Sequence, residues 1–245
     1  MRRAVSALLA LLIFAYLFGV LMKAPIPGDY RDERYNYYSP LSEREANESV
    51  PEHYVERGEE ETGSQNIVTS IVVLYRGFDT LGEVTVLFTA ATGVAFLLST
   101  QRSKGEKEKK KEPNFVASTG VGLVLPFILL VGAYIFIHGH LTPGGGFPGG
   151  AVIATGFVLM LVAYPRFQLR EKKVSVVEAF SGLAFAVIGL ISLIMGLTFL
   201  ENYLPKGVAG TLLSAGIIPL IYIAIGFKVG SELSAIVSHM KGGEE

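Results

Sequence analysis

Residues 115–137 contain no charged side chain over 23 residues, and runs of this kind limit the possible folds more than any other feature of the sequence. A helix needs about 20 apolar residues to cross a hydrocarbon core of about 30 Å. The stretches that approach or meet this requirement are 4–22, 78–98, 115–137, 147–164, 174–200 and 207–237. The sequence therefore predicts an all-α integral membrane protein with about six transmembrane helices, a multi-pass protein of the cell membrane.

The distribution of Lys and Arg predicts that both termini are cytoplasmic. With six spans and inner termini, the cytoplasmic segments hold fourteen of the 21 Lys and Arg residues, Lys228 included, and the short outer loops are nearly bare. The positive-inside rule describes this bias. The run 4–22 also fits the apolar part of a signal peptide, but its length and the absence of a small-residue cleavage site favour a retained helix.

A basic linker at 101–113, QRSKGEKEKKKEP, divides the chain into a module of residues 1–100 and a module of residues 114–245. The first module contains an acidic outer segment at 23–65, whose composition cannot bury enough apolar surface to fold alone. After it, apolar residues recur at helical spacing and predict an amphipathic helix over 66–76 on the membrane surface. The apolar residues of this stripe are Ile67, Ile71, Leu74 and Phe78.

Two carboxylates, Asp79 and Glu83, lie four residues apart near the start of the second span and share a helix face. Near a helix N-terminus a carboxylate can merely complement the helix dipole, which is the simpler interpretation of Asp79. Glu83 lies further inside the apolar run, where an ionisable side chain is costly and marks a functional candidate. Lys228 and Glu232 are expected to stabilise a helix end, and no lysine is expected in mid-membrane.

The segment 138–150, HGHLTPGGGFPGG, connects two apolar runs and is rich in Gly and Pro. Such residues can simply close a tight turn. They also permit positive φ and a close approach to another backbone, and His138 and His140 could change charge near neutral pH. Gly182, Gly189 and Gly196 recur at sevenfold spacing, as expected for close helix packing. The glycines expected to serve subunit packing are Gly144, Gly145, Gly146, Gly149, Gly150, Gly182, Gly189 and Gly196.

These motifs resemble two subunits of the multi-subunit Mrp-type sodium/proton antiporters. HGHLTPGGGFPGG and the apolar helix after it resemble the MnhB/MrpB subunit, while NIVTSIVVLYRGFDTLGEVTVL resembles the C-terminal part of the large antiporter subunit. In some archaeal membrane-bound hydrogenases and sulfur reductases this C-terminal part is a separate small subunit. The resemblances cover about 66–99 and 115–237, which implies a fusion of two subunits with the basic linker as the join.

The resemblance implies a membrane subunit of a module that transports Na⁺ and H⁺. Glu83 matches the acidic position that follows FDT in the family, and the candidates for ion translocation are Glu83, Asp79, His138 and His140. Other antiporter-module membrane subunits and peripheral iron–sulfur or hydrogenase-like subunits are the implied partners, with the lipid bilayer around them. The fusion favours a hydrogenase or sulfur reductase over a stand-alone antiporter.

Other functions are weaker alternatives, and the scaffold alternative stays open. A scaffold would use the glycines only to hold partners together. A metal centre would need three or four ligands, whereas His-x-His supplies two. The Gly-rich segment lacks the Lys and Ser/Thr of a phosphate-binding loop. Without Cys the chain can hold no thiolate-ligated metal or iron–sulfur cluster, so no cofactor is expected in it. Its basic residues form no stripe for nucleic acid.

Overall fold

The computed structural model describes residues 50–101 and 112–242, and for 99–101 it describes the backbone alone. The expected helix 4–22, most of the acidic segment, the middle of the basic linker and both termini lie outside these residues. Every regular element in the described part is a helix. The helices are α2 (Val50–Thr62), α3 (Ile67–Thr69), the π-helical segment η3 (Ser70–Tyr75), α4 (Gly77–Gln101), α5 (Phe115–Ile137), α6 (Gly146–Ala163), α7 (Glu171–Ile194) and α8 (Ile218–Gly242).

Five of these helices, α4 to α8, are long and apolar enough to cross a membrane. The prediction of an all-helical membrane fold is therefore confirmed for the described residues. The expected helix 115–137 agrees with α5, which starts where the Asn114 side chain accepts hydrogen bonds from the backbone N–H groups of Val116 and Ala117. Such a cap satisfies donors that the first turn of a helix leaves unpaired.

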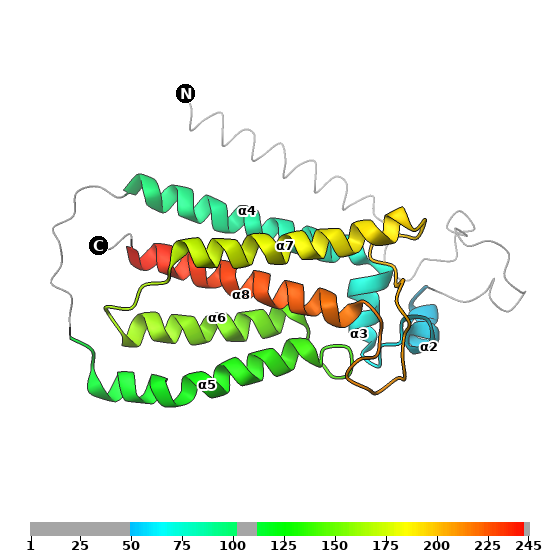
Figure 1. Cartoon of the computed structure of the whole chain (residues 1–245), viewed down its shortest axis with the longest axis horizontal. Coiled ribbons are helices and arrows are strands. Elements are labelled where there is room, and N and C mark those ends of the chain that lie inside the picture. The colour runs from blue at the N-terminus through cyan, green and yellow to red at the C-terminus, as the bar shows by residue number, and fades with distance from the viewer. Residues whose placement is uncertain (1–49, 102–111, 243–245) are drawn as a thin grey trace, which may run out of the picture. The chain divides into compact units, whose positions relative to one another are not determined.

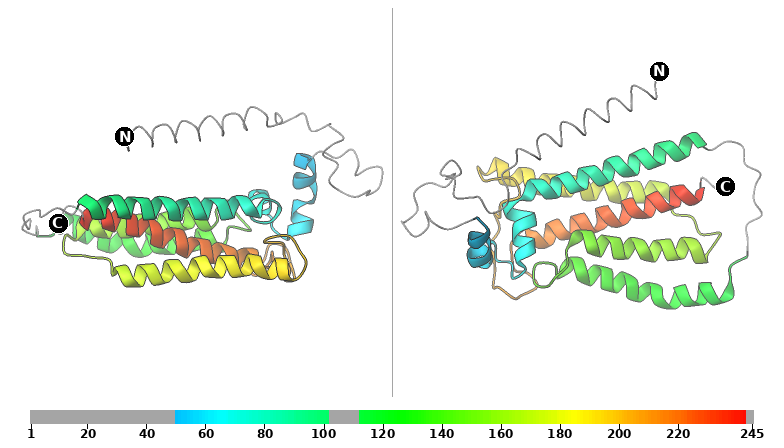
Figure 2. Two further views of the ribbon diagram at one scale, coloured as in Figure 1. Left: turned by 90° about the horizontal axis from the view of Figure 1, so that it is seen from above. Right: turned by 180° about the vertical axis from the view of Figure 1, so that it is seen from behind.

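Helix α8 is the centre of the bundle. In the apolar 18-residue stretch of α8, 61% is buried inside the protein. The corresponding share is 6% for α4 and 11% for both α5 and α7. It packs against α4, α6 and α7, while α5 packs mainly on α6 (Figures 1 and 2). A membrane protein whose outer helices expose this much apolar surface presents that surface to lipid or to other chains.

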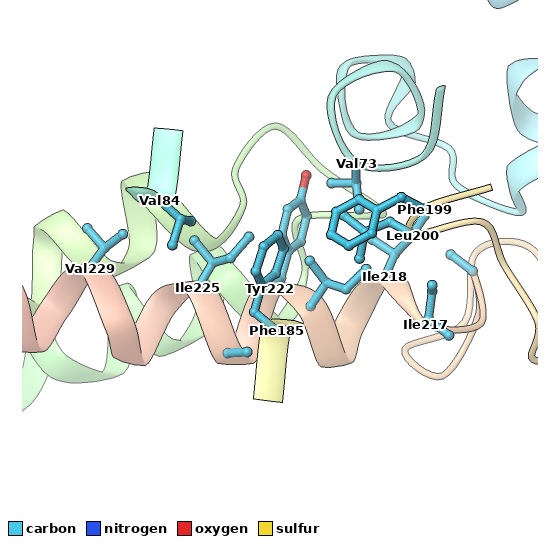
Figure 3. Packing of buried hydrophobic residues seen from close by; sticks show 13 residues of the cluster. Val73, Val84, Phe185, Phe199, Leu200, Ile217, Ile218, Tyr222, Ile225 and Val229 are labelled. Carbon is cyan, nitrogen blue, oxygen red and sulfur yellow. The ribbon is translucent and has the colours of Figure 1, made fainter. Parts of the chain in front are cut away.

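The hydrophobic core lies around the first half of α8. Figure 3 shows its Ile218, Tyr222 and Ile225 among side chains from other elements. Val73 of η3, Val84 of α4 and Phe185 of α7 pack against them. The core thus joins helices from both sides of the basic linker in one compact unit, Tyr54–Glu245.

The expected span 174–200 ends too late in the sequence, because α7 ends at Ile194. The expected span 207–237 begins too early, because α8 begins at Ile218. Residues 195–217 form an irregular connection, in which Leu200 and Ala215 are buried with positive φ. Asn202 supports this connection, because its side chain donates to the Ala215 carbonyl and accepts from the N–H groups of Leu204 and Ile217. Pro219 occupies the first turn of α8, where its missing N–H removes no hydrogen bond of the helix.

Gly196 lies beyond the end of α7, whereas the sequence placed it inside the span 174–200. It follows α7 with φ +79°, and a Cβ built on it would meet no atom within 4 Å. The N–H of Leu197 bonds to the Ser192 carbonyl and that of Gly196 to the Leu193 carbonyl. This is the Schellman arrangement that ends many helices, and it favours glycine at this position.

The expected amphipathic helix at 66–76 is present as α3 and η3, but its buried side differs from the predicted stripe. Thr69, Ser70 and Val73 are buried, whereas Ile67 and Leu74 are only partly covered. The difference arises because the polar side chains of this helix bond to the Gly-rich turn of the same chain.

Candidate ion-translocation site

Helix α4 presents both candidate carboxylates on its outside. Asp79 lies in the first turn and forms an exposed ion pair with Arg76, with 2.6 Å between Oδ2 and Nη2. Glu83 is six residues beyond Gly77, or about 9 Å along the helix. It is exposed on an apolar helix, in which Phe78 is 67% and Val86 68% exposed. The two carboxylates therefore have different surroundings, since the charge of Asp79 is already balanced by a cation.

The Gly-rich turn is held by hydrogen bonds from the segment before α4. Asn66 Nδ2 donates to the carbonyl oxygens of Gly139, at 2.8 Å, and Thr142, at 3.0 Å. The Asn66 N–H donates to the His140 carbonyl at 3.1 Å, and Ser64 Oγ donates to the same oxygen at 2.9 Å. These bonds satisfy carbonyl groups that the turn itself leaves unpaired.

Thr69 links this turn to the central helix. Its Oγ1 donates to the Gly139 carbonyl at 2.7 Å and lies 2.7 Å from the hydroxyl of Tyr222 on α8. Because the Thr69 proton is directed to Gly139, the Tyr222 hydroxyl is the donor to Thr69. The same Tyr222 interacts electrostatically with Glu83. Hydrogen bonds therefore run from Tyr222 through Thr69 to the turn, and Glu83 acts on Tyr222 through its charge.

The sequence pattern did not identify Ser64, Asn66 and Thr69 as site residues. Their only signal was polarity on one side of an otherwise apolar helix, which also fits a solvent-exposed face. Their partners in the turn lie 70 or more positions away in the sequence, so local patterns could not reveal them.

The two histidines have separate surroundings. His140 is fully buried, its Nε2 lies 3.4 Å from the Thr211 carbonyl oxygen, and its Nδ1 has no hydrogen-bond partner among the described residues. Burial lowers the pKa of His140 below its usual value of 6.5, although the contact with the Thr211 carbonyl opposes this shift. His138 stacks on Tyr134 with 4.1 Å between ring centres. No group of three or more potential metal ligands occurs in residues 50–101 and 112–242.

The glycines of the turn allow close contacts within the chain. Gly145 alone among Gly144, Gly145 and Gly146 has a positive φ, +133°. A Cβ on Gly144 would come within 2.8 Å of the Ile135 carbonyl oxygen, and one on Gly146 within 2.6 Å of the Ile225 Cβ.

The first turns of α6 pack equally closely. A Cβ on Gly149 would lie 2.8 Å from the Gly132 carbonyl oxygen, and one on Gly150 2.7 Å from that of Gly226. Contacts this short do not occur in folded proteins, so a larger residue would push α6 away from α5 and α8.

Two glycines of α7 also face side chains of the same chain. A Cβ on Gly189 would overlap the ring of Phe199, and one on Gly182 would come within 3.4 Å of the Lys228 side chain. Gly189 therefore makes room for the buried connection before α8, and Gly182 makes room for a lysine.

Lys228 and Glu232 form a buried ion pair, 2.5 Å from Nζ to Oε1, with side chains 8% and 0% exposed. The expectation that no lysine lies in mid-membrane is wrong. Because α8 begins at Ile218, Lys228 lies ten residues into the span, or about 15 Å along a membrane core of about 30 Å. Lys228 therefore should not be counted among the Lys and Arg residues of the cytoplasmic segments.

A compact bundle of five apolar helices, with charged groups placed inside it and on one outer helix, is the architecture of a multi-pass membrane protein. Residues 116–235 match the family described as "Domain related to MnhB subunit of Na+/H+ antiporter". Residues 37–113 match a second family, that of the MbhE subunit of MBH.

Similar proteins include a chain in the structure of the membrane-bound sulfane sulfur reductase (MBS), an archaeal respiratory membrane complex. It is 42% identical, with a TM-score of 0.71, and 98% of each chain is covered. An uncharacterized protein of Methanocaldococcus jannaschii is 30% identical over 198 residues, 69% of this chain and 74% of that protein.

A chain in the Mrp complex structure from Dietzia sp. has a TM-score of 0.63 at 21% identity, covering 98% of this chain and 26% of that chain, so it shares the fold. The chain therefore consists of a domain of the MbhE family followed by a domain related to the MnhB subunit of Na+/H+ antiporters.

Proposed function

We propose that the chain is a membrane subunit of an Mrp-type antiporter module, in the membrane arm of a respiratory hydrogenase or sulfur reductase complex. Na⁺ and H⁺ are the transported ions, and Glu83 is the carboxylate that exchanges them with a neighbouring chain. The join between the two modules, 1–100 and 114–245, lies in the basic linker 101–113. Support for the complex comes from the 42% identity to a chain of the sulfane sulfur reductase over nearly its whole length.

The exposure of Glu83 carries the proposal of an ion-exchanging role. A carboxylate facing lipid at this depth costs several kcal/mol when ionised, so such groups normally face a partner chain or a water-filled path. Asp79 lacks this property because it lies at the helix margin and pairs with Arg76. The charge of Glu83 acts on Tyr222, whose hydroxyl bonds to Thr69 of the clamp on the Gly-rich turn, and this electrostatic effect offers a route by which the charge state of Glu83 affects the turn.

We further propose six transmembrane helices with cytoplasmic termini. Each helix from α4 to α8 runs in the direction opposite to the one before it (Figure 1). The end of α4, the start of α5, the end of α6, the start of α7 and the end of α8 therefore lie at the same end of the bundle, the linker side. If residues 4–22 add one span before them, both termini and the linker lie on the cytoplasmic side, as the positive charges favour. The Gly-rich turn and Glu83 then lie toward the outer face.

A scaffold without an ion-carrying residue is the second candidate function. The observation that favours it is the hydrogen-bonded clamp between Asn66, Thr69 and the turn, which joins the two modules through uncharged amide, hydroxyl and carbonyl groups.

Copurification tests the membership of the complex. A tag on the chain in native membranes should retrieve antiporter-like membrane subunits together with iron–sulfur proteins and a hydrogenase-like or sulfur reductase-like subunit. Retrieval of antiporter subunits alone would exclude the redox complex, and retrieval of neither would refute the proposed module.

A further inference from the structure

The MnhB-related module contains a buried charged cluster that the candidates above do not include. Lys228 and Glu232 of α8 form its ion pair, and Glu178 of α7 interacts electrostatically with Glu232. The Lys228 ammonium also lies 5.2 Å from the centre of the Phe88 ring on α4. Gly182 leaves room for the lysine stem beside α7. Three helices therefore converge on one cation and two carboxylates inside an apolar bundle.

The cluster is incomplete as a structural ion pair. Glu232 Oε1 accepts from Lys228, but Oε2 is fully buried and accepts from no donor among the described residues. A buried carboxylate oxygen without a partner is costly, and a purely structural pair would normally satisfy it. A proton on Oε2 would remove that cost, because the carboxyl group would lose its charge and gain a donor.

A pocket of about 330 Å³ leads toward this cluster from the linker-side ends of α7 and α8. Glu178 lies in its wall, seven residues inside α7, or about 10 Å from the helix start. His239 and Glu171 lie nearer the ends of these helices, with 4.0 Å between Nε2 and Oε1. Water in such a pocket can reach Glu178, which interacts with Glu232.

We propose that Glu178, Glu232 and Lys228 form a second proton-binding site, loaded through this pocket from the linker side of the membrane. Glu178 takes a proton from water in the pocket. It passes that proton to Glu232 Oε2 and becomes ionised again. Neutral Glu232 then no longer holds Lys228 as an ion pair, and the ammonium keeps its contact with the Phe88 ring. Loss of the proton to the next acceptor, or back to Glu178, restores the pair.

The groups that can titrate near Glu232 are those on the helices around it. On α7 they are Glu171, Lys172, Lys173 and Glu178, and on α8 Tyr222, Lys228, Glu232, His239 and Lys241. Helix α4 contributes Asp79 and Glu83, the latter five residues before Phe88. Helix α6 contributes none within Gly146–Ala163. Among the described groups, Lys228 and Glu178 are the ones that interact with Glu232.

The test uses the whole complex in inverted membrane vesicles, with a ΔpH-sensitive dye and ²²Na⁺ uptake as readouts. The first variant combines Lys228→Met with Glu232→Leu, because replacing both partners of a buried pair by apolar residues usually preserves folding. We expect an assembled complex with proton transport lowered about tenfold or more. Glu178→Gln should lower the maximal rate while leaving the Na⁺ concentration for half-maximal activity unchanged.

The matched control is Glu112→Gln, which removes the same charge from an exposed pair with Arg166 on the linker side. It should leave both readouts unchanged. Infrared difference spectra of the complex across a pH titration provide a readout that a structural role would not affect. A carboxylic-acid band should appear in the unaltered protein and in Glu178→Gln, and disappear in Glu232→Gln.

The inference rests on the proposed function, and one comparison separates their failures. If Glu83→Gln lowers transport while the double variant transports normally, the cluster is a structural pair and the inference is overturned. If neither variant affects transport, the proposed function itself fails. If the double variant assembles poorly, the infrared spectra provide the test. A carboxylic-acid band that persists in Glu232→Gln also overturns the inference.

Discussion

Replacing Thr69 by valine should loosen the Gly-rich turn without changing the shape of the site. The substitution removes the bond to the Gly139 carbonyl and the bond to the Tyr222 hydroxyl, both 2.7 Å long. Gly139 keeps the donor of Asn66, but within the described chain the buried Tyr222 hydroxyl loses its hydrogen-bond partner. Leaving one buried polar group unpaired costs about 1–3 kcal/mol, so we expect a loss of about 2 kcal/mol.

Hydrogen exchange of the intact complex measures this effect. A loss of about 2 kcal/mol in local stability raises the exchange rate of opening-limited amides about 30-fold. The increase should be confined to residues 138–150 and to α3. Thr89→Val is the control, because Thr89 lies on the exposed side of α4 and bonds only within its own helix. Equal protection of the turn in both variants would refute the role of Thr69 as a clamp.

Three further predictions concern the turn and the topology. Gly150→Ala should destabilise the assembled protein by about 1–3 kcal/mol, because the new Cβ would meet the Gly226 backbone, whereas Gly120→Ala, in open space, should not lower its melting temperature. Burial lowers the pKa of His140, so the stability that neutral His140 provides is complete above pH 6.5 and decreases as the pH falls below it. Thermal melts at stepwise lower pH should show this decrease, and His140→Gln should reduce it. Ser103→Cys should react with an impermeant thiol reagent only from the cytoplasmic side, and labelling from outside intact cells would contradict the six-span proposal.

The sequence predicted the helices best where composition alone decides. The run 115–137 contains no charged residue, and α5 has the same limits because a helix satisfies the hydrogen-bonding groups of its backbone in lipid. The positions of the candidate carboxylates relative to the start of α4 could be predicted for the same reason. Whether Glu83 faces inward or outward could not, because that depends on which side of α4 packs against α8.

The connection 195–217 shows why the predicted spans failed at their ends. Its residues are almost as apolar as those of α8, but Gly207, Gly210 and Gly216 adopt positive φ and Asn202 replaces the hydrogen bonds of a helix. Hydropathy does not register such local backbone chemistry. The start of α8 also determines the depth of Lys228, so an error of eleven residues at Gly207 hid a buried cation.

The central claim is tested most directly by measuring sodium-coupled proton transport of the assembled complex, once with Glu83→Gln and once with Asp79→Asn. Both substitutions remove one carboxylate charge from the same face of α4, and Asp79 is already balanced by Arg76. We expect Glu83→Gln to lower transport about tenfold or more while Asp79→Asn keeps most of it, with equal amounts of assembled complex. Equal losses in the two variants, or full transport by Glu83→Gln, would contradict the assignment of Glu83 as the ion-exchanging carboxylate.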